Sequence, residues 1–359
     1  MRAVMFYDAH DLRVEDIPEP GAPKPGWVKL KLAYNGICGS DLHMFTDGGF
    51  TGNTPTATEE NPLTGETLPI VLGHEFSGTV VELGEGVEDV SIGQNVAVRA
   101  NVSCGECAAC RSGKSNICRK QWGFGISGGG GGLAEYINVP AGNVHVVGDM
   151  DLGHAAMLEP LSVATHAVRL SGADAGQTAL VGGAGPVGLF TAAILKAKGL
   201  TVIVSEPSQA RRDIALSASH ADYAINPIDE DLNALVARVT DGLGADMVFD
   251  AAGVGPVTHQ LIGNVRPGGH VQIIALHGKP LEIQVAAELH YTEATFSGTM
   301  AYLPEDFEDS IAMVNSGKLD LEAFVTKRID PENIVAEGFD TLINHNDTAV
   351  KILVKTSRD

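Results

Sequence analysis

The chain has 359 residues, of which 44% are hydrophobic and 19% are charged, so it is long enough for two domains with a large core. Its 45 acidic residues outnumber the 24 basic ones and give a formal net charge of −21. A surface this acidic disfavours binding to nucleic acid and to anionic membranes.

The sequence also bears on location. No apolar run approaches the roughly 18 residues that a transmembrane helix needs. The N-terminal stretch 1–8 becomes charged too early for a signal peptide. We therefore expect a cytoplasmic protein. In a reducing compartment its five cysteines suggest metal binding or catalysis before disulfides.

The first part of the chain predicts mainly β-structure. Residues 1–35 form short alternating runs broken by prolines, with the clearest strand at 27–34. Residues 46–68 predict a long loop, interpreted as the rim of a substrate site or, alternatively, as a tolerated surface insertion. Further strands are expected at 79–83, 95–98 and 133–139, a tight or flexible glycine loop at 127–132, and a helix at 155–170.

From Thr178 onward, buried strands and helices alternate, which predicts a doubly wound parallel sheet. Strands are expected at 179–183, 201–206, 222–226, 246–250, 270–276 and 295–300, and helices at 186–198, 207–218, 229–239 and 255–264. Residues 266–269 predict a turn. The tail predicts helices near 304–315 and 331–343 and a strand at 350–355. The sequence thus predicts a nucleotide domain at 159–296 inserted into a β-rich domain made of 1–158 and 297–359.

The turn after the first strand of this alternating region carries a G-x-G-x-x-G fingerprint. Its glycines allow a tight turn, close approach of a pyrophosphate and close packing of helix on strand, and the helix N-terminus favours an anion. The residues concerned are Gly183, Gly185, Pro186, Val187 and Gly188. A glycine-rich turn without a ligand is the alternative.

Glu206 lies 21 positions after Gly185, at the end of the second strand. A carboxylate there can bind both hydroxyls of an adenosine ribose and would repel a 2′-phosphate, so the sequence predicts NAD and not NADP. Arg211 and Arg212 follow on the next helix. Either arginine could instead bind the 2′-phosphate of NADP, stack on the adenine or form an ion pair with Glu206.

Four cysteines follow the spacing C-x2-C-x2-C-x7-C: Cys104, Cys107, Cys110 and Cys118. Four thiolates can close a tetrahedral shell around Zn²⁺ and leave no position open, which predicts a structural site. An iron–sulfur cluster or a disulfide pair is the competing interpretation.

A second group could hold zinc with one position open, as in a catalytic site: Cys38, His74, Glu75 and Glu159. Asp41 is suited to hold the other ring nitrogen of His74. The alternative is a buried cysteine, a core histidine and surface carboxylates.

With these motifs in view, the chain resembles the zinc-dependent medium-chain alcohol dehydrogenases along its whole length. The matching segments are 36–41, 73–78, 104–118 and 181–188. Within the family it looks most like the (R,R)-2,3-butanediol dehydrogenases, with sorbitol-type polyol dehydrogenases next. That closer match lies in 61–65, 128–136, 158–161, 296–302 and 325–329.

The resemblance implies a Rossmann domain inserted into a GroES-like catalytic domain, and a homo-oligomer, usually a dimer or tetramer. It implies that Cys38 and His74 bind the catalytic zinc and that Glu75 and Glu159 supply carboxylates directly or through water. The better-known alcohol branch has a second cysteine near Glu159. Its absence here favours a polyol-type site.

The implied reaction is reversible hydride transfer between a secondary alcohol, most simply 2,3-butanediol or its ketone acetoin, and NAD. Ser40 and His43 are suited to relay the proton. Otherwise they are a turn hydroxyl and a surface histidine. Polyol, threonine and simple alcohol dehydrogenases remain alternatives within the family, and a non-catalytic zinc-binding protein is the alternative outside it.

Overall fold

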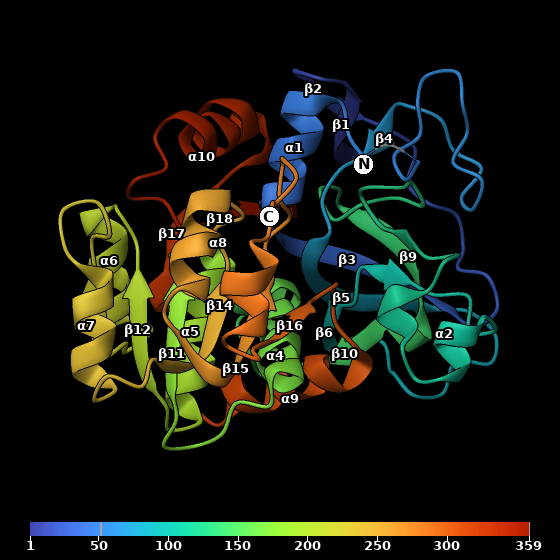
Figure 1. The fold of residues 1–359 in the computed structure, drawn as a ribbon. Helices are drawn as coiled ribbons and strands as arrows, with labels where there is room; N and C mark the ends of the chain where they lie inside the picture. The colour runs from blue at the N-terminus through green and yellow to red at the C-terminus, as the bar shows by residue number, and fades with distance from the viewer. Residues whose placement is uncertain (51, 359) are drawn as a thin grey trace. The chain divides into compact units, whose positions relative to one another are not determined.

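The computed structural model describes residues 1–50 and 52–358 and divides the chain into two compact units (Figure 1). The first unit contains Met1–Glu159, Leu303–Ile311 and Val325–Asp359, and the second contains Pro160–Tyr302 and Ala312–Phe324. The sequence predicts the domain boundaries at 158/159 and 296/297. The structure therefore groups residues 297–302 and 312–324 with the second unit.

The second unit is built on one six-stranded sheet in the order β13-β12-β11-β14-β15-β16, and every pair in it is parallel. The strands are β11 (Thr178–Gly182), β12 (Thr201–Ser205), β13 (Tyr223–Ile225), β14 (Ala245–Asp250), β15 (Val265–Ile273) and β16 (Thr295–Gly298). The order reverses between β11 and β14, as in a doubly wound Rossmann sheet. The predicted fold class of this part is confirmed.

Four helices follow the strands of this sheet: α5 (Pro186–Ala197), α6 (Gln209–Ser217), α7 (Leu232–Val239) and α8 (Gly255–Ile262). Ser208 and Asp231 cap α6 and α7, because their side chains accept hydrogen bonds from backbone N–H groups three residues on. A buried core of aliphatic side chains, including Leu180, Ile203 and Val248, fills the space around the sheet.

The first unit is β-rich, as predicted. Its main sheet runs β10-β6-β5-β3-β18-β17, with β9 also paired to β3, and a smaller sheet runs β2-β1-β4. The strands are β1 (Arg2–Asp8), β2 (Asp11–Asp16), β3 (Trp27–Gly36), β4 (Ile70–Val71), β5 (Glu75–Leu83), β6 (Asn95–Val98), β9 (Tyr136–Pro140), β10 (Val144–Val146), β17 (Val325–Ile329) and β18 (Lys351–Lys355), with the small pair β7 (Asn101–Val102) and β8 (Trp122–Gly123). Because β18 pairs antiparallel with β3, strands from the first and last parts of the chain join one sheet.

Several predicted elements differ from the observed ones. The helix expected at 155–170 is two helices, α3 (Leu152–Ala156) and α4 (Leu158–Ser171), with Met157 between them. The turn expected at 266–269 lies inside β15, where the register shifts. In the tail, α9 (Pro304–Asn315) matches its prediction. The segment expected as a helix at 331–343 is helical throughout but changes type: a 3-10 turn Pro331–Asn333 leads into a π-helix Ile334–Phe339 and then α10 (Asp340–Asn344).

The glycine loop at 127–132 is tightly turned and packs on the long loop before β4. Ser127 is fully buried, and its hydroxyl donates to Asn53 Oδ1 at 2.6 Å. Its carbonyl accepts from Thr64 Oγ1 at 2.8 Å. The two loops therefore form one folded element of the first unit.

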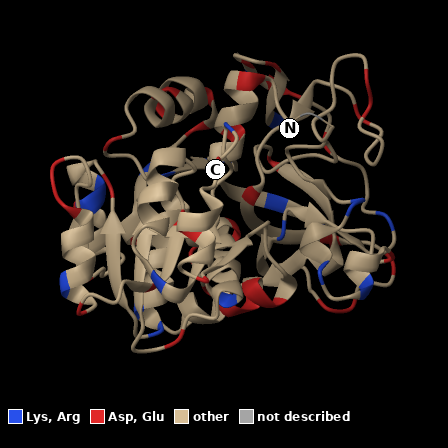
Figure 2. Ribbon diagram, viewed as in Figure 1, with Lys and Arg blue, Asp and Glu red and all other residues tan. Residues whose placement is uncertain are grey.

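Acidic side chains are spread over both units, including the first turn of α9 (Figure 2). They outnumber the basic ones, in keeping with the net charge of −21. In the part of the chain that the structure describes, no helix combines the length and apolar character needed to cross a bilayer.

Candidate functional site

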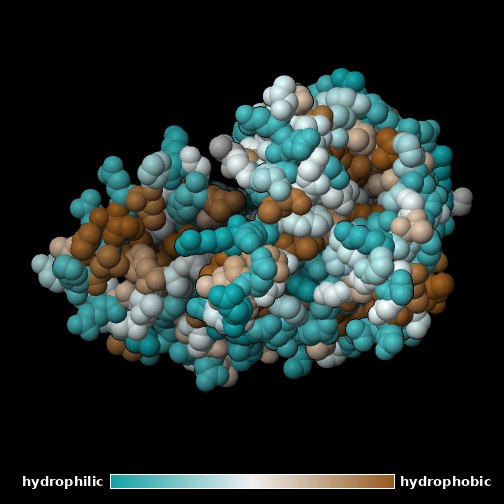
Figure 3. Space-filling view, turned by 90° about the vertical axis from the view of Figure 1, so that its right-hand side faces the viewer, coloured by the Kyte–Doolittle hydropathy of each residue, from teal (hydrophilic) through white to brown (hydrophobic). Residues whose placement is uncertain are grey.

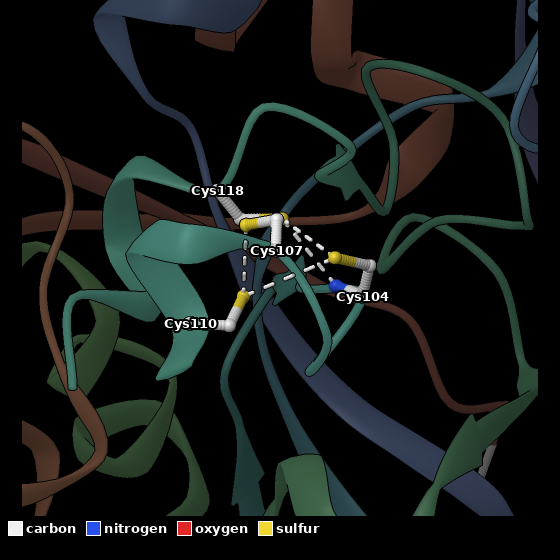
Figure 4. Close-up of side chains that lie close together, drawn as sticks. All are labelled: Cys104, Cys107, Cys110 and Cys118. Carbon is white, nitrogen blue, oxygen red and sulfur yellow. Dashed lines mark hydrogen bonds between the residues drawn. The ribbon is translucent and has the colours of Figure 1, made fainter. Parts of the chain in front are cut away.

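The four clustered cysteines bring their sulfurs together around one point (Figure 4). Cys107 caps the short helix α2 (Ala108–Arg111), and Cys118 follows a 3-10 turn. The Sγ–Sγ distances are 3.4 Å from Cys104 to Cys118, 3.5 Å from Cys107 to Cys110, 3.7 Å from Cys107 to Cys118 and 4.0 Å from Cys104 to Cys110. All four thiols are free.

These distances agree with a single metal ion. A tetrahedron of thiolates with Zn–S bonds of about 2.3 Å has sulfurs about 3.8 Å apart. A 4Fe–4S cluster would place each thiolate on a different iron and separate the sulfurs further. Backbone N–H groups also prepare the thiolates: the hydrogen bond from Cys110 lowers the pKa of Cys107 to about 6. Burial raises the pKa of Cys118 to about 11.

The second group of candidate ligands begins where β3 ends. Cys38 is the N-cap of helix α1 (Gly39–Asp47), an element that the sequence did not predict. The backbone N–H of Cys38 donates to Asp41 Oδ2 at 2.9 Å, which closes the first turn of the helix. Ser40 lies in this turn with its hydroxyl 3.9 Å from Cys38 Sγ.

His74 stands between β4 and β5, after Gly73, whose φ of +96° turns the chain. Ligand atoms of Cys38, His74 and Glu75 lie within 4.8 Å of one another. Asp41 Oδ1 and His74 Nδ1 lie 3.3 Å apart, as the sequence suggested. Among the described residues neither atom has a hydrogen-bond partner of good geometry.

The charges around His74 favour a cation. Burial lowers the pKa of His74, but Asp41 and Cys38 outweigh burial and hold this pKa well above its ordinary value. A partly exposed thiol with a buried imidazole and a buried carboxylate is a donor set that zinc accepts. The residues present therefore fit a zinc ion, with Asp41 in place to orient the His74 ring.

Glu75 has a partner that the sequence did not reveal. Its carboxylate accepts two hydrogen bonds from Lys351 Nζ, at 2.7 and 2.8 Å, and both side chains are buried. Lys351 also donates to the carbonyl of Ile37 at 3.0 Å. Burial lowers the pKa of Lys351, but Glu75 and Cys38 raise it above its ordinary value.

The remaining candidates are placed as follows. Glu159 is buried at the start of α4 and contributes to the raised pKa of Lys351, but the structure does not bring it into the ligand group of Cys38, His74 and Glu75. His43 is exposed on α1, and its Nδ1 lies 3.1 Å from Asp47 Oδ2.

The glycine turn of the second unit has the geometry expected of the fingerprint. Gly183 has a φ of +92°, and a Cβ at Gly188 would lie 2.0 Å from the Gly183 carbonyl oxygen. Gly185 is the N-cap of α5, with Pro186 in the first turn. No described atom lies within 4 Å of a Cβ built at Gly185. Packing within the protein therefore does not require this glycine, whereas a pyrophosphate lying close to the backbone would.

Glu206 is buried and fixed against this turn. Its carboxylate accepts from the N–H groups of Ala184 at 2.8 Å and Ser208 at 2.9 Å. Arg212 is buried as well and donates to the carbonyls of Glu206 and Pro207. Arg211 lies on α6, and its N–H donates to the capping Ser208. Of the two arginines, Arg212 therefore has a structural role in the turn.

Comparison with known proteins identifies the family. A family model described as an alcohol dehydrogenase GroES-like domain matches residues 24–149, and a zinc-binding dehydrogenase model matches 186–316. The chain is 41% identical over 355 residues to an (R,R)-butanediol dehydrogenase of Neisseria gonorrhoeae, covering 99% of each chain. It is 34% identical to an L-threonine 3-dehydrogenase of Thermococcus kodakarensis, covering 95% of each.

Among solved structures, the 2R,3R-butanediol dehydrogenase of Bacillus subtilis superposes with a TM-score of 0.91 at 35% identity, covering 99% of both chains. The resemblance seen in the sequence is thus confirmed. The protein belongs to the zinc-binding alcohol dehydrogenases, a family in which zinc and NAD are the typical cofactors.

Proposed function

We propose that this enzyme oxidises a small vicinal diol to a hydroxyketone with NAD and catalyses the reverse reduction, with 2,3-butanediol and acetoin as the substrate pair. The observation that carries this proposal is the 41% identity over nearly the whole chain to a butanediol dehydrogenase. The group of Cys38, His74 and Glu75 supports it, because it offers a metal site with a carboxylate.

In this proposal the first unit is the catalytic zinc domain, and it holds two ions. Cys104, Cys107, Cys110 and Cys118 hold a structural zinc. Cys38 and His74, with a carboxylate from Glu75 or Glu159, hold the catalytic one. When bound, the catalytic zinc acts as a Lewis acid that makes the substrate hydroxyl a better proton donor. A second hydroxyl on the substrate suits this site, because a buried carboxylate such as Glu159 can accept a hydrogen bond from it.

The proton leaves along α1. Ser40 and His43 are three residues apart, so their side chains lie on the same side of the helix. His43 Nδ1 lies beside Asp47, which leaves Nε2 to accept a proton from the Ser40 hydroxyl, while Ser40 receives the proton that the substrate hydroxyl releases. Because His43 is exposed, it can pass that proton to water.

The second unit binds NAD in this proposal. The turn at 183–188 lies along the pyrophosphate. Glu206 accepts hydrogen bonds from the hydroxyls of the adenosine ribose, and Arg211 lies beside that ribose. Arg212 is held by two carbonyls and is poorly placed to bind a 2′-phosphate. We expect Glu206→Ser to weaken the preference of kcat/KM for NAD over NADP by at least about tenfold, since a close like charge is removed. A wild-type enzyme that uses NADP as well as NAD would overturn this assignment.

A substrate panel at fixed zinc tests the reaction. kcat/KM for 2,3-butanediol should exceed the values for L-threonine and sorbitol. The L-threonine 3-dehydrogenase relative makes threonine the second candidate. A tenfold preference for threonine or sorbitol would replace the substrate assignment and leave the fold and cofactor untouched.

We also propose that the protein is a homo-oligomer that joins through β16. β16 ends the six-stranded sheet. Before and after it in the chain stand four exposed apolar side chains: Leu276, Val285, Tyr291 and Met300. Apolar side chains reach the surface at several places (Figure 3), but an unpaired strand edge is also a template for a second copy. Light scattering should give the molar mass of a dimer or a larger oligomer for the wild type, and Tyr291→Asp should lower this mass towards that of the monomer. The same change at Ile228, which is also exposed, should have no effect.

A cytoplasmic location completes the proposal, because five free thiols suit a reducing compartment. Fractionation of the producing cells would check it.

A further inference from the structure

Asp250 lies where the loops at the carboxyl edge of the parallel sheet meet. It is the last residue of β14 and pairs across the sheet with Gly182 of β11 and Ile273 of β15. The strand order reverses between β11 and β14. Ligands of doubly wound sheets bind outside the carboxyl ends of the strands at such a reversal.

The Asp250 carboxylate is fully buried and receives four hydrogen bonds. Oδ1 accepts from the N–H groups of Ala252 and Gly253, both at 3.0 Å. Oδ2 accepts from Thr258 Oγ1 at 2.6 Å and from His277 Nε2 at 2.9 Å. Because a carboxylate can only accept, Nε2 of His277 must carry a proton.

The backbone packs equally closely around Asp250. Its carbonyl accepts from the N–H groups of Ile274 and Ala275, and the N–H of Ala251 donates to Gly182. Gly253 has a φ of +68°, and a Cβ there would lie 2.7 Å from the Leu276 carbonyl oxygen. The loop after β14 and the segment after β15 therefore touch.

His277 is the side chain that fixes the segment after β15 to this carboxylate. The segment from 274 to 284 contains neither helix nor strand. Thr258 and the two loop amides already hold the chain from 251 to 258. Without His277 the segment would keep its first two backbone bonds and the packing of Ile283 on the core, and it would lose its hydrogen bond to Asp250.

We propose that His277, held by Asp250, is a positioning residue for the nicotinamide half of the dinucleotide. The inference rests on the proposed NAD function. Each half of a doubly wound fold takes one mononucleotide. The fingerprint and Glu206 belong to the half containing β11 and β12, which takes the adenylate. Asp250 and His277 belong to the other half, which takes nicotinamide mononucleotide.

The test compares NADH with 5′-AMP, because AMP occupies only the adenylate half. Binding of both is measured by calorimetry, which does not depend on turnover. His277→Leu should raise the Kd of NADH about tenfold, the effect of losing a hydrogen bond to a charged group, and leave the Kd of AMP unchanged. His277→Gln can still donate an amide N–H to Asp250 and should restore NADH binding.

The matched control is His259→Leu. His259 also pairs with a carboxylate in this unit, Glu288 at 2.5 Å, but stands in the last turn of α8. This variant should bind both ligands like the wild type. Unchanged NADH binding in His277→Leu, equal weakening of NADH and AMP, or no rescue by glutamine would each overturn the inference. A wild-type protein that binds neither NADH nor AMP would instead overturn the proposed function.

Discussion

At the scale of single residues, the pair formed by Glu75 and Lys351 is the main addition of the structure to the candidate site. Both side chains are almost completely buried, and their ionic groups are 2.7 Å apart. Removing one partner of a buried ion pair leaves the other charge buried without a counter-charge, which lowers the unfolding free energy by about 3–5 kcal/mol. We expect Lys351→Met to lower the unfolding free energy of the metal-free protein by this amount, measured by urea denaturation.

The double variant Glu75→Gln with Lys351→Met should recover a large part of that loss, because no charge is left buried alone. An exposed lysine–glutamate pair, Lys327 with Glu337, provides the control. Lys327→Met should change the unfolding free energy by less than about 1 kcal/mol. If the loss of unfolding free energy in the double variant equalled the sum of the losses in Glu75→Gln and Lys351→Met alone, the two side chains would not be coupled.

The cysteines at 104–118 could be selected from the sequence because their metal-binding spacing is uncommon. Cys38 and His74 lie far apart in the chain and are indicated by the resemblance of segments 36–41 and 73–78 to the dehydrogenase family, and the structure brings them together with Glu75. Lys351 could not be chosen, because it lies 276 positions from Glu75 and a lysine in a terminal strand is usually exposed. Its burial depends on β18 pairing with β3, a long-range contact that no local pattern reveals.

At the scale of elements, the glycine loop shows how a backbone conformation fixes packing. Gly129 has a φ of +76°, and a Cβ there would lie 2.4 Å from the Trp122 ring. Gly129→Ala should therefore lower the unfolding free energy by about 1–3 kcal/mol through overpacking and strain. The measurement is thermal denaturation of both variants, with Gly142→Ala as the control. Gly142 has no positive φ and no atom within 4 Å of a built Cβ, so its substitution should lower the unfolding free energy much less. Equal effects at the two positions would contradict the packing seen here.

The elements of the parallel sheet were predictable because each strand is a short buried run between turn residues. Helix α1 was not, because its N-cap is Cys38, an unusual residue at that position. Its first turn is closed by the Asp41 carboxylate and its end by Gly48 at a φ of 83°. The expected turn at 266–269 was wrong because β15 continues through Pro267 and the two glycines, which lie where its register with β14 shifts.

The contact between β10 and α9 should make stability depend on pH. His145 Nε2 accepts from Arg99 Nε at 2.9 Å, its Nδ1 faces Glu308, and its ring lies 4.7 Å from the Phe307 ring. Burial lowers the pKa of His145 below its ordinary value of 6.5, and Arg99 adds to this against the opposing effect of Glu308. The unfolded chain therefore binds the proton more readily than the folded one. The contribution of His145 to the unfolding free energy is fully present above its ordinary pKa and is lost as the pH falls below that value.

Urea denaturation from about pH 8 to pH 5 should show this decline in the wild type. In His145→Gln the slope attributable to this residue should vanish, although the variant is less stable at every pH because it loses one of the two hydrogen bonds. Parallel curves for the two proteins would show that His145 titrates alike in the folded and unfolded states.

At the scale of the whole molecule, one unit carries both candidate metal groups and the other carries the nucleotide fingerprint. The first unit is assembled from three stretches of the chain, and its main sheet is completed only by β17 and β18. The sheet of this unit therefore combines strands from distant parts of the chain, whereas the parallel sheet from β11 to β16 is continuous in sequence. The overall architecture could be predicted from this β-rich, alternating, β-rich sequence of elements.

The two metal groups should differ in how readily they lose zinc. The four thiolates of Cys104, Cys107, Cys110 and Cys118 would occupy every position of a tetrahedral ion, whereas the group with Cys38 and His74 leaves a position where a chelator can bind. Elemental analysis should find two zinc ions per chain. Graded chelation should abolish turnover while the thermal transition is still intact, and lower the transition only when the second ion leaves. Cys38→Ser should retain one zinc and the wild-type melting behaviour, whereas Cys107→Ser should lose stability even with excess zinc. A fully active enzyme with one zinc per chain would refute the two-site assignment, and simultaneous loss of activity and fold would refute the proposed difference between the sites.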